Sequence, residues 1–183
     1  VYVQKPYTAF DVERGIEKPA VELVGFAKTS VLAPNATETV KVTVDESEFR
    51  VYDANDAKTY IITEGDYLLT AATDSHNAIN NILAYQNHSG LDAEGNKDMV
   101  SKYSLKYNST TYSKSSKTGG KITNLFDEAD INKYSGKGKN NAVTYVSRNN
   151  WEGTLPTKTA TVSMTTQLLK DVLPEDNQEA LVE

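Results

Sequence analysis

Short segments in which apolar and polar residues alternate, separated by turn residues, fill residues 1–73 of the chain. The clearest segment is residues 37–45, where Val40, Val42 and Val44 alternate with polar side chains. A period of two is typical of a strand with one buried face and one exposed face. Other β-prone segments lie at residues 1–3, 22–28, 49–51, 60–62 and 67–71. Short strands at this close spacing predict a mainly β fold, an antiparallel β-sandwich.

The pattern changes near Asp74, and the side chain of Asp74 or of Ser75 can cap a short helix by accepting from free backbone N–H groups. Ile79, Ile82 and Leu83 would then share one face of that helix. We therefore divide the chain into a sandwich module, residues 1–75, and a mixed, loop-rich extension with short helices and strands, residues 76–183.

Composition excludes several classes of site. The chain has no cysteine, which excludes disulfides and cysteine-based zinc sites and fits either the cytoplasm or an exported protein. It has no apolar run of about 18 residues, so we expect no transmembrane helix. It begins at Val1 without a signal-peptide pattern, and we interpret it as a fragment of a longer polypeptide. The net charge of -6 and the scattered lysines argue against a nucleic-acid partner.

The order of residues in the first part resembles the fibronectin type III-like module of family 3 glycoside hydrolases, the β-glucosidase group. The residues that carry the resemblance are Lys18-Pro19, Glu22-Leu23-Val24-Gly25-Phe26-Ala27-Lys28, Val31-Leu32-Ala33-Pro34, Thr39-Val40, Val42, Val44, Phe49, Tyr52-Asp53 and Glu64-Gly65-Asp66-Tyr67. The resemblance implies a fibronectin III-like or Ig-like sandwich. It also implies a bacterial parent enzyme that acts on carbohydrate and needs no cofactor.

Two departures from the family pattern concern the sandwich. The family module has strands before the one that starts at Val1, so the sandwich lacks its first strands if Val1 is its beginning. Its open edge could then pair with another chain. The Pro-Gly turn of the family is Pro34-Asn35 here, and asparagine tolerates a left-handed backbone.

The second part resembles the segment that follows the module in large bacterial members of the family. The matching residues are Asn124-Leu125-Phe126-Asp127-Glu128-Ala129-Asp130 and the run from Val143 to Pro156. In such enzymes this segment lies among the sandwich, an α/β domain and the catalytic barrel, which are the partners that the resemblance implies. Trp151 and Arg148 are the residues we expect to dock against another domain or to contact carbohydrate.

No catalytic residue is expected in this chain. The family nucleophile stands in a Ser-Asp-Trp context, and Asn149-Asn150-Trp151 has amides where a carboxylate is needed. For metals, the alternation of oxygen ligands in a calcium loop is matched only weakly, by Asp92, Glu94, Asn96 and Asp98. The glycine and the closing glutamate of such a loop are out of place, so we expect no metal.

Three functions remain open at this point. The leading hypothesis is a non-catalytic accessory region of a family 3 β-glycosidase that supports the catalytic domains. The alternatives are a carbohydrate-binding module that uses exposed aromatic side chains and an Ig-like adhesion or interaction domain. An exposed row of aromatic side chains would favour sugar binding, whereas buried aromatic side chains with an apolar surface patch would favour docking.

Overall fold

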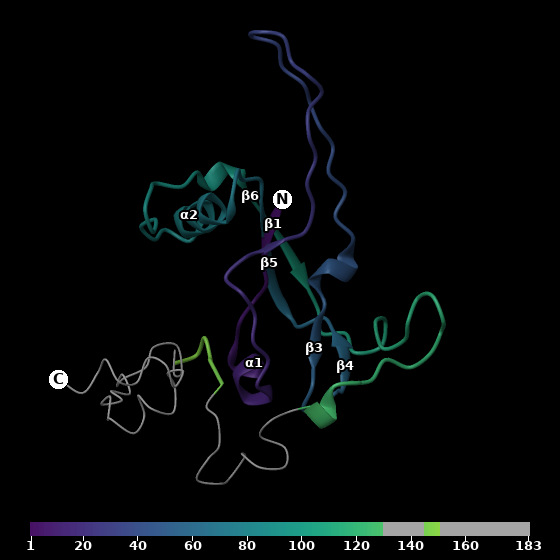
Figure 1. Cartoon of the computed structure of the whole chain (residues 1–183). Helices are drawn as coiled ribbons and strands as arrows, with labels where there is room; N and C mark the ends of the chain where they lie inside the picture. The colour runs from purple at the N-terminus through teal and green to yellow at the C-terminus, as the bar shows by residue number, and fades with distance from the viewer. Residues whose placement is uncertain (130–144, 151–183) are drawn as a thin grey trace, which may run out of the picture.

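Two antiparallel sheets form the framework of residues 1–129 and 145–150, which the computed structural model describes (Figure 1). The larger sheet has the strand order β2-β1-β5-β6, and the smaller sheet pairs β3 with β4. The strands are β1 (Tyr2–Gln4), β2 (Glu22–Leu23), β3 (Val51–Asp53), β4 (Thr59–Ile61), β5 (Gly65–Thr70) and β6 (Val100–Leu105). The prediction of a mainly β, antiparallel fold is confirmed.

One apolar core joins the two sheets. It consists of Val3, Phe49, Ile62 and Tyr67, of which none is more than 5% exposed. Val3 and Tyr67 come from the central strands β1 and β5, and Ile62 directly follows β4. Phe49 ends the short helix η1 (Glu46–Phe49), and its ring centroid lies 5.2 Å from that of Tyr67. This shared core gives the arrangement the character of a fibronectin III-like sandwich.

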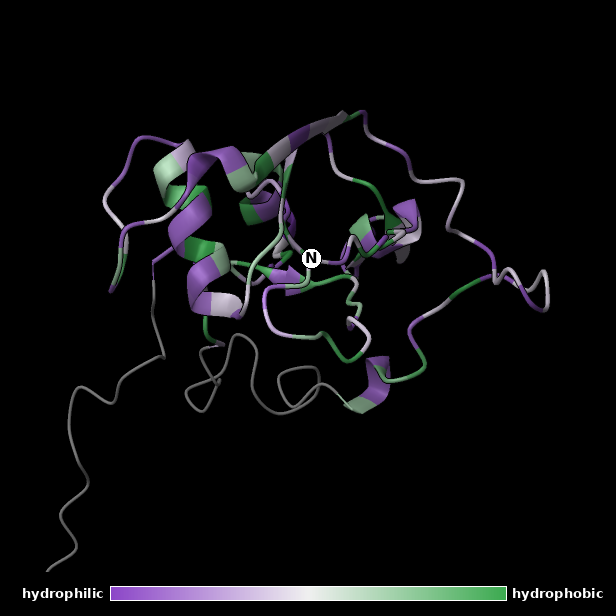
Figure 2. Cartoon of the chain, turned by 90° about the horizontal axis from the view of Figure 1, so that it is seen from above, coloured by the Kyte–Doolittle hydropathy of each residue, from purple (hydrophilic) through white to green (hydrophobic). Residues whose placement is uncertain are grey.

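The helix α2 (Ser75–Tyr85) starts where the sequence predicts. The Asp74 carboxylate accepts a hydrogen bond from the Asn77 N–H at 2.9 Å, which satisfies one of the free donors of the first turn. Figure 2 shows that α2 combines hydrophobic and hydrophilic residues, and its apolar residues Ala78 and Ile82 are fully buried. Within the described residues, no helix has the length and apolar character needed to cross a membrane.

Two buried asparagines of α2 hold the loop that follows the helix. The Asn80 side-chain oxygen accepts from the Leu91 N–H at 2.7 Å, and that of Asn81 accepts from the Asn96 N–H at 2.8 Å. Gly95 lies so close to the helix that an added Cβ would stand 1.9 Å from the Asn80 carbonyl oxygen. The loop is therefore packed on α2 and leads into β6, which completes the large sheet beside β5.

The short helix α1 (Ala9–Arg14) was not predicted. Its start carries a local signal, because the Asp11 carboxylate accepts from the Thr8 N–H at 2.8 Å. Its end at Gly15 adopts the left-handed conformation, with φ +64°, that glycine allows most readily. Six residues do not form a stable helix alone, so α1 depends on tertiary contacts that the local pattern does not reveal.

Residues 26–44 form an exposed hairpin-shaped arm that projects from the sheets (Figure 1). The strand predicted at residues 37–45 is absent from the described structure, which is a correction to the sequence analysis; the strand predicted at 22–28 is reduced to β2. The alternating valines are present, but the structure gives this segment no neighbouring strand to supply ladder hydrogen bonds. Only the base of the arm is packed, where an added Cβ on Gly25 would lie 2.7 Å from Val42. At the tip, Asn35 takes φ 62°, as the Pro34-Asn35 turn suggested.

Asp53 is a fully buried carboxylate that organises the turn between β3 and β4. It accepts backbone hydrogen bonds from Asn55, Asp56 and Ala57 and a 2.6 Å ion pair from Arg14 of α1. Burial by itself would raise the pKa of Asp53, but these donors together hold that pKa below its usual range.

The variant Asp53→Asn should lower the free energy of unfolding at pH 7 by about 2 kcal/mol, because several hydrogen bonds to a charged acceptor are weakened. A lowered pKa means that this stabilisation is complete above the unfolded pKa of about 3.9 and is lost as the pH falls through the folded pKa. Urea unfolding at pH 7 and at low pH should therefore show that the free energies of unfolding of the variant and of the parent chain converge in acid. The control Asp98→Asn, at an exposed carboxylate, should leave stability nearly unchanged. A constant difference at both pH values would contradict this account.

Candidate docking site at Arg148

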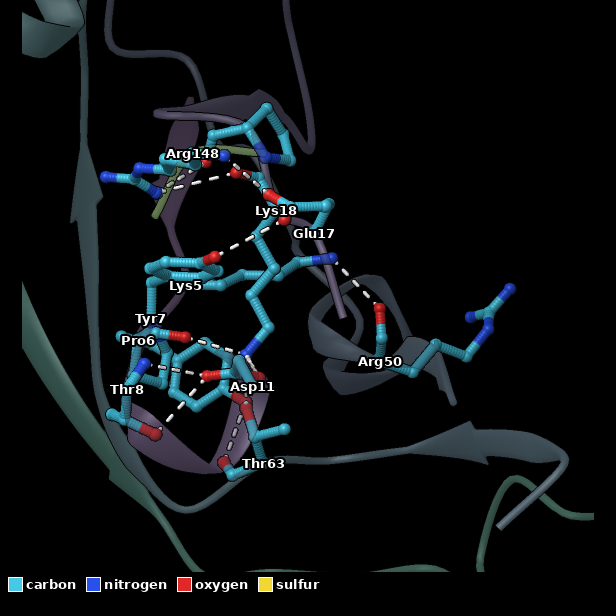
Figure 3. Close-up of polar contacts among 12 residues, drawn as sticks. Lys5, Pro6, Tyr7, Thr8, Asp11, Glu17, Lys18, Arg50, Thr63 and Arg148 are labelled. Carbon is cyan, nitrogen blue, oxygen red and sulfur yellow. Dashed lines mark hydrogen bonds and ion pairs between the residues drawn. The ribbon is translucent and has the colours of Figure 1, made fainter. Parts of the chain in front are cut away.

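A buried lysine forms the base of the site (Figure 3). The Lys18 side chain is 1% exposed, and its Nζ lies 2.6 Å from Oδ1 of the fully buried Asp11. Nζ also donates to the Pro6 carbonyl oxygen at 2.7 Å and to Thr63 Oγ1 at 2.8 Å. Four segments of the chain therefore meet at one ammonium group: the strand end after β1, α1, the segment before β2, and the residue after Ile62.

Burial lowers the pKa of Lys18, and the hydrogen bond and charge of Asp11 oppose that shift. A buried ammonium group is tolerated only where an opposite charge and hydrogen-bond acceptors replace its hydration. Lys18 has both, and the cluster fixes the backbone of residues 17–19 against the sandwich. Lys18-Pro19 contributed to the family resemblance, but its burial could not be read from the local sequence.

Arg148 binds the outer side of this same segment (Figure 3). Its backbone N–H donates to Glu17 Oε2 at 3.0 Å. Its guanidinium group lies 3.5 and 3.4 Å from the carbonyl oxygens of Lys18 and Pro19 and 5.2 Å from the ring centroid of Tyr7. A cation over an aromatic face is attracted by the ring quadrupole. Arg148 therefore attaches residues 145–150 to a surface about 130 positions earlier in the chain.

The contacts of Arg148 limit which parts of this surface are open to a ligand. The guanidinium covers one face of the Tyr7 ring, so that face is not open for stacking on a sugar. Tyr7 is further oriented by its hydroxyl, which donates to Glu17 Oε1 at 3.4 Å. These contacts of Arg148 hold two parts of the same chain together. Trp151, the other residue expected to dock, lies outside the described residues.

The residues of the weak calcium-loop pattern are engaged in local contacts. The Asp92 carboxylate binds the His76 ring at 3.0 Å and the Asn80 amide at 2.7 Å. The Asn96 side chain accepts from the Asp98 N–H in the first turn of η2 (Lys97–Met99). Glu94 lies exposed in the loop between them. In the described part of the chain, no group of three or more histidine or carboxylate side chains is placed to hold a metal ion.

The comparisons with known proteins concern the sandwich. Residues 1–75 match the family model described as a fibronectin type III-like domain. No curated protein and no solved structure matches the chain. The resemblance found in the sequence is therefore confirmed for the module itself.

Proposed function

We propose that the chain is a non-catalytic accessory region of a family 3 β-glycosidase, where it supports the catalytic domains of the same polypeptide. The fibronectin type III-like domain of residues 1–75 supports the proposal, because this module is found in family 3 glycoside hydrolases. The function would be mechanical: the module would hold neighbouring domains in place and would take no part in bond cleavage.

The exposed arm, residues 26–44, is the structural feature that most directly supports this proposal. Its apolar side chains Phe26, Val31, Leu32 and Val40 are 75%, 102%, 41% and 41% exposed. Apolar side chains gathered on one projecting segment are typical of a surface that packs against another domain. A neighbouring domain in the parent enzyme would cover them.

The buried carboxylates also favour a supporting role. A retaining glycosidase needs two carboxyl groups about 5 Å apart that face one sugar. Asp11 and Asp53 are fully buried, and each is held by a cation, Lys18 and Arg14 respectively. Both carboxylates therefore stabilise the fold and are not presented to a substrate.

Hydrolysis of an aryl-β-glucoside tests the proposal. The isolated chain should give no turnover, whereas the complete polypeptide of which it is part should hydrolyse the substrate. Turnover by the isolated chain that persists through rigorous purification would overturn the non-catalytic assignment. A complete polypeptide without β-glycosidase activity would overturn the assignment to this class of enzyme.

A carbohydrate-binding module is the second candidate, because Tyr103 and Tyr107 are 48% and 42% exposed. Both rings, however, also pack within the fold: Phe49 lies 6.2 Å from Tyr103 and Phe10 lies 5.6 Å from Tyr107. Calorimetric titration with cello-oligosaccharides separates the candidates. The accessory role predicts no saturable heat, and a saturable heat would favour direct sugar binding.

A further inference from the structure

An open groove lies between α2 and the end of β1, on the side of the large sheet away from the shared core. Its volume is about 1090 Å³, slightly above the roughly 300–1,000 Å³ that is usual for small-molecule pockets. Its apolar lining comes from Pro6, Leu68, Ile79, Leu83 and Leu91. Leu68 adjoins the core residue Tyr67 on β5, so its side chain points to the opposite face of the sheet.

Arg148 also lines this groove, and it is the residue clamped to Lys18, Pro19 and Tyr7. The described part of the chain ends two residues later, at position 150, and the next residue is Trp151. Trp151, the only tryptophan of the chain, thus follows by three positions in the sequence a residue that lines an apolar groove.

We propose that this groove binds the segment Trp151-Glu152-Gly153-Thr154-Leu155-Pro156 of the same chain. Six extended residues span about 20 Å, which is enough to run along α2, whose 11 residues measure about 16 Å. Trp151 and Leu155 supply apolar side chains that match the lining. The single charge of the segment, Glu152, is opposite in sign to the net charge of the groove wall, where Lys5, Lys102 and Arg148 outnumber Asp66. This internal docking is independent of the proposed glycosidase context.

The single tryptophan makes the docking measurable in the complete 183-residue chain. Docked Trp151 should emit at shorter wavelength than N-acetyltryptophanamide, and acrylamide should quench it several-fold less. Leu83→Asp, in the groove, should move the emission wavelength and the acrylamide quenching toward those of the free compound. The matched control Leu32→Asp, on the arm, should leave them unchanged. Emission and quenching of the parent chain equal to those of the free compound would overturn the proposal.

A second measurement does not depend on a charge placed in the groove. The chain has no cysteine, so Gln86→Cys gives one attachment point for a bimane fluorophore at the groove, and Thr29→Cys gives one on the arm. Contact with tryptophan quenches bimane. Trp151→Phe should therefore brighten the label at position 86 and not the label at position 29. No change at position 86 would overturn the proposal, as would release of Trp151 by cello-oligosaccharides, which would assign the groove to sugar.

Discussion

The variant Lys18→Met is expected to lower the free energy of unfolding by about 3–5 kcal/mol, the range measured when one partner of a buried ion pair is removed. The loss arises because the fully buried Asp11 carboxylate would be left without its cation. The segment that binds Arg148 would also lose its internal support. Urea unfolding at pH 7 measures the change.

Two further variants show that the buried charge is the cause. Lys41→Met removes an exposed lysine of the arm and should change stability by no more than about 0.5 kcal/mol. The double variant Lys18→Met with Asp11→Asn should recover much of the loss, because the amide still accepts from Thr8 and carries no charge. A double variant as unstable as Lys18→Met would assign the loss to packing.

The variant Phe49→Ala should cost about 3–5 kcal/mol, because it opens a cavity where the two sheets meet. Phe49 is 5% exposed and its ring lies against Tyr67. The same substitution at Phe26, which is 75% exposed on the arm, provides a matched control and should cost about 0.5 kcal/mol or less. Thermal and urea unfolding of both variants would test the shared core; equal losses would contradict it.

The central strands and α2 could be predicted because their signals are local. The apolar and polar residues that identify β5 as a strand all lie within its six positions. The helix α2 has a capping aspartate directly before its apolar face. The arm shows where the same reasoning fails. Val40, Val42 and Val44 satisfy the period of a strand, but a strand also needs a partner, and a local pattern does not contain one.

The candidate site was predicted only in outline. Arg148 was expected to dock against another domain or to contact carbohydrate, which stays a prediction. The structure shows its contacts with residues 17–19 of the same chain, and these could not be predicted because about 130 positions separate the two segments. The role of Lys18 was missed because lysine is almost never fully buried unless it is paired, and its partners Asp11 and Thr63 lie in other segments. Buried networks of this kind depend on the tertiary fold.

The pairing of strand β6 with β5 shows that the large sheet extends beyond the residues of the family match. The fibronectin type III-like match stops at residue 75, yet β6, residues 100–105, pairs with β5 along its whole length. A protein cut at the family boundary would expose the backbone donors and acceptors of β5, together with the apolar faces of Tyr67 and Leu68. Bare strand edges recruit other copies of the chain. Because residues beyond the module cover this edge of β5, we expect a fragment that ends at residue 75 to self-associate more readily than the complete chain.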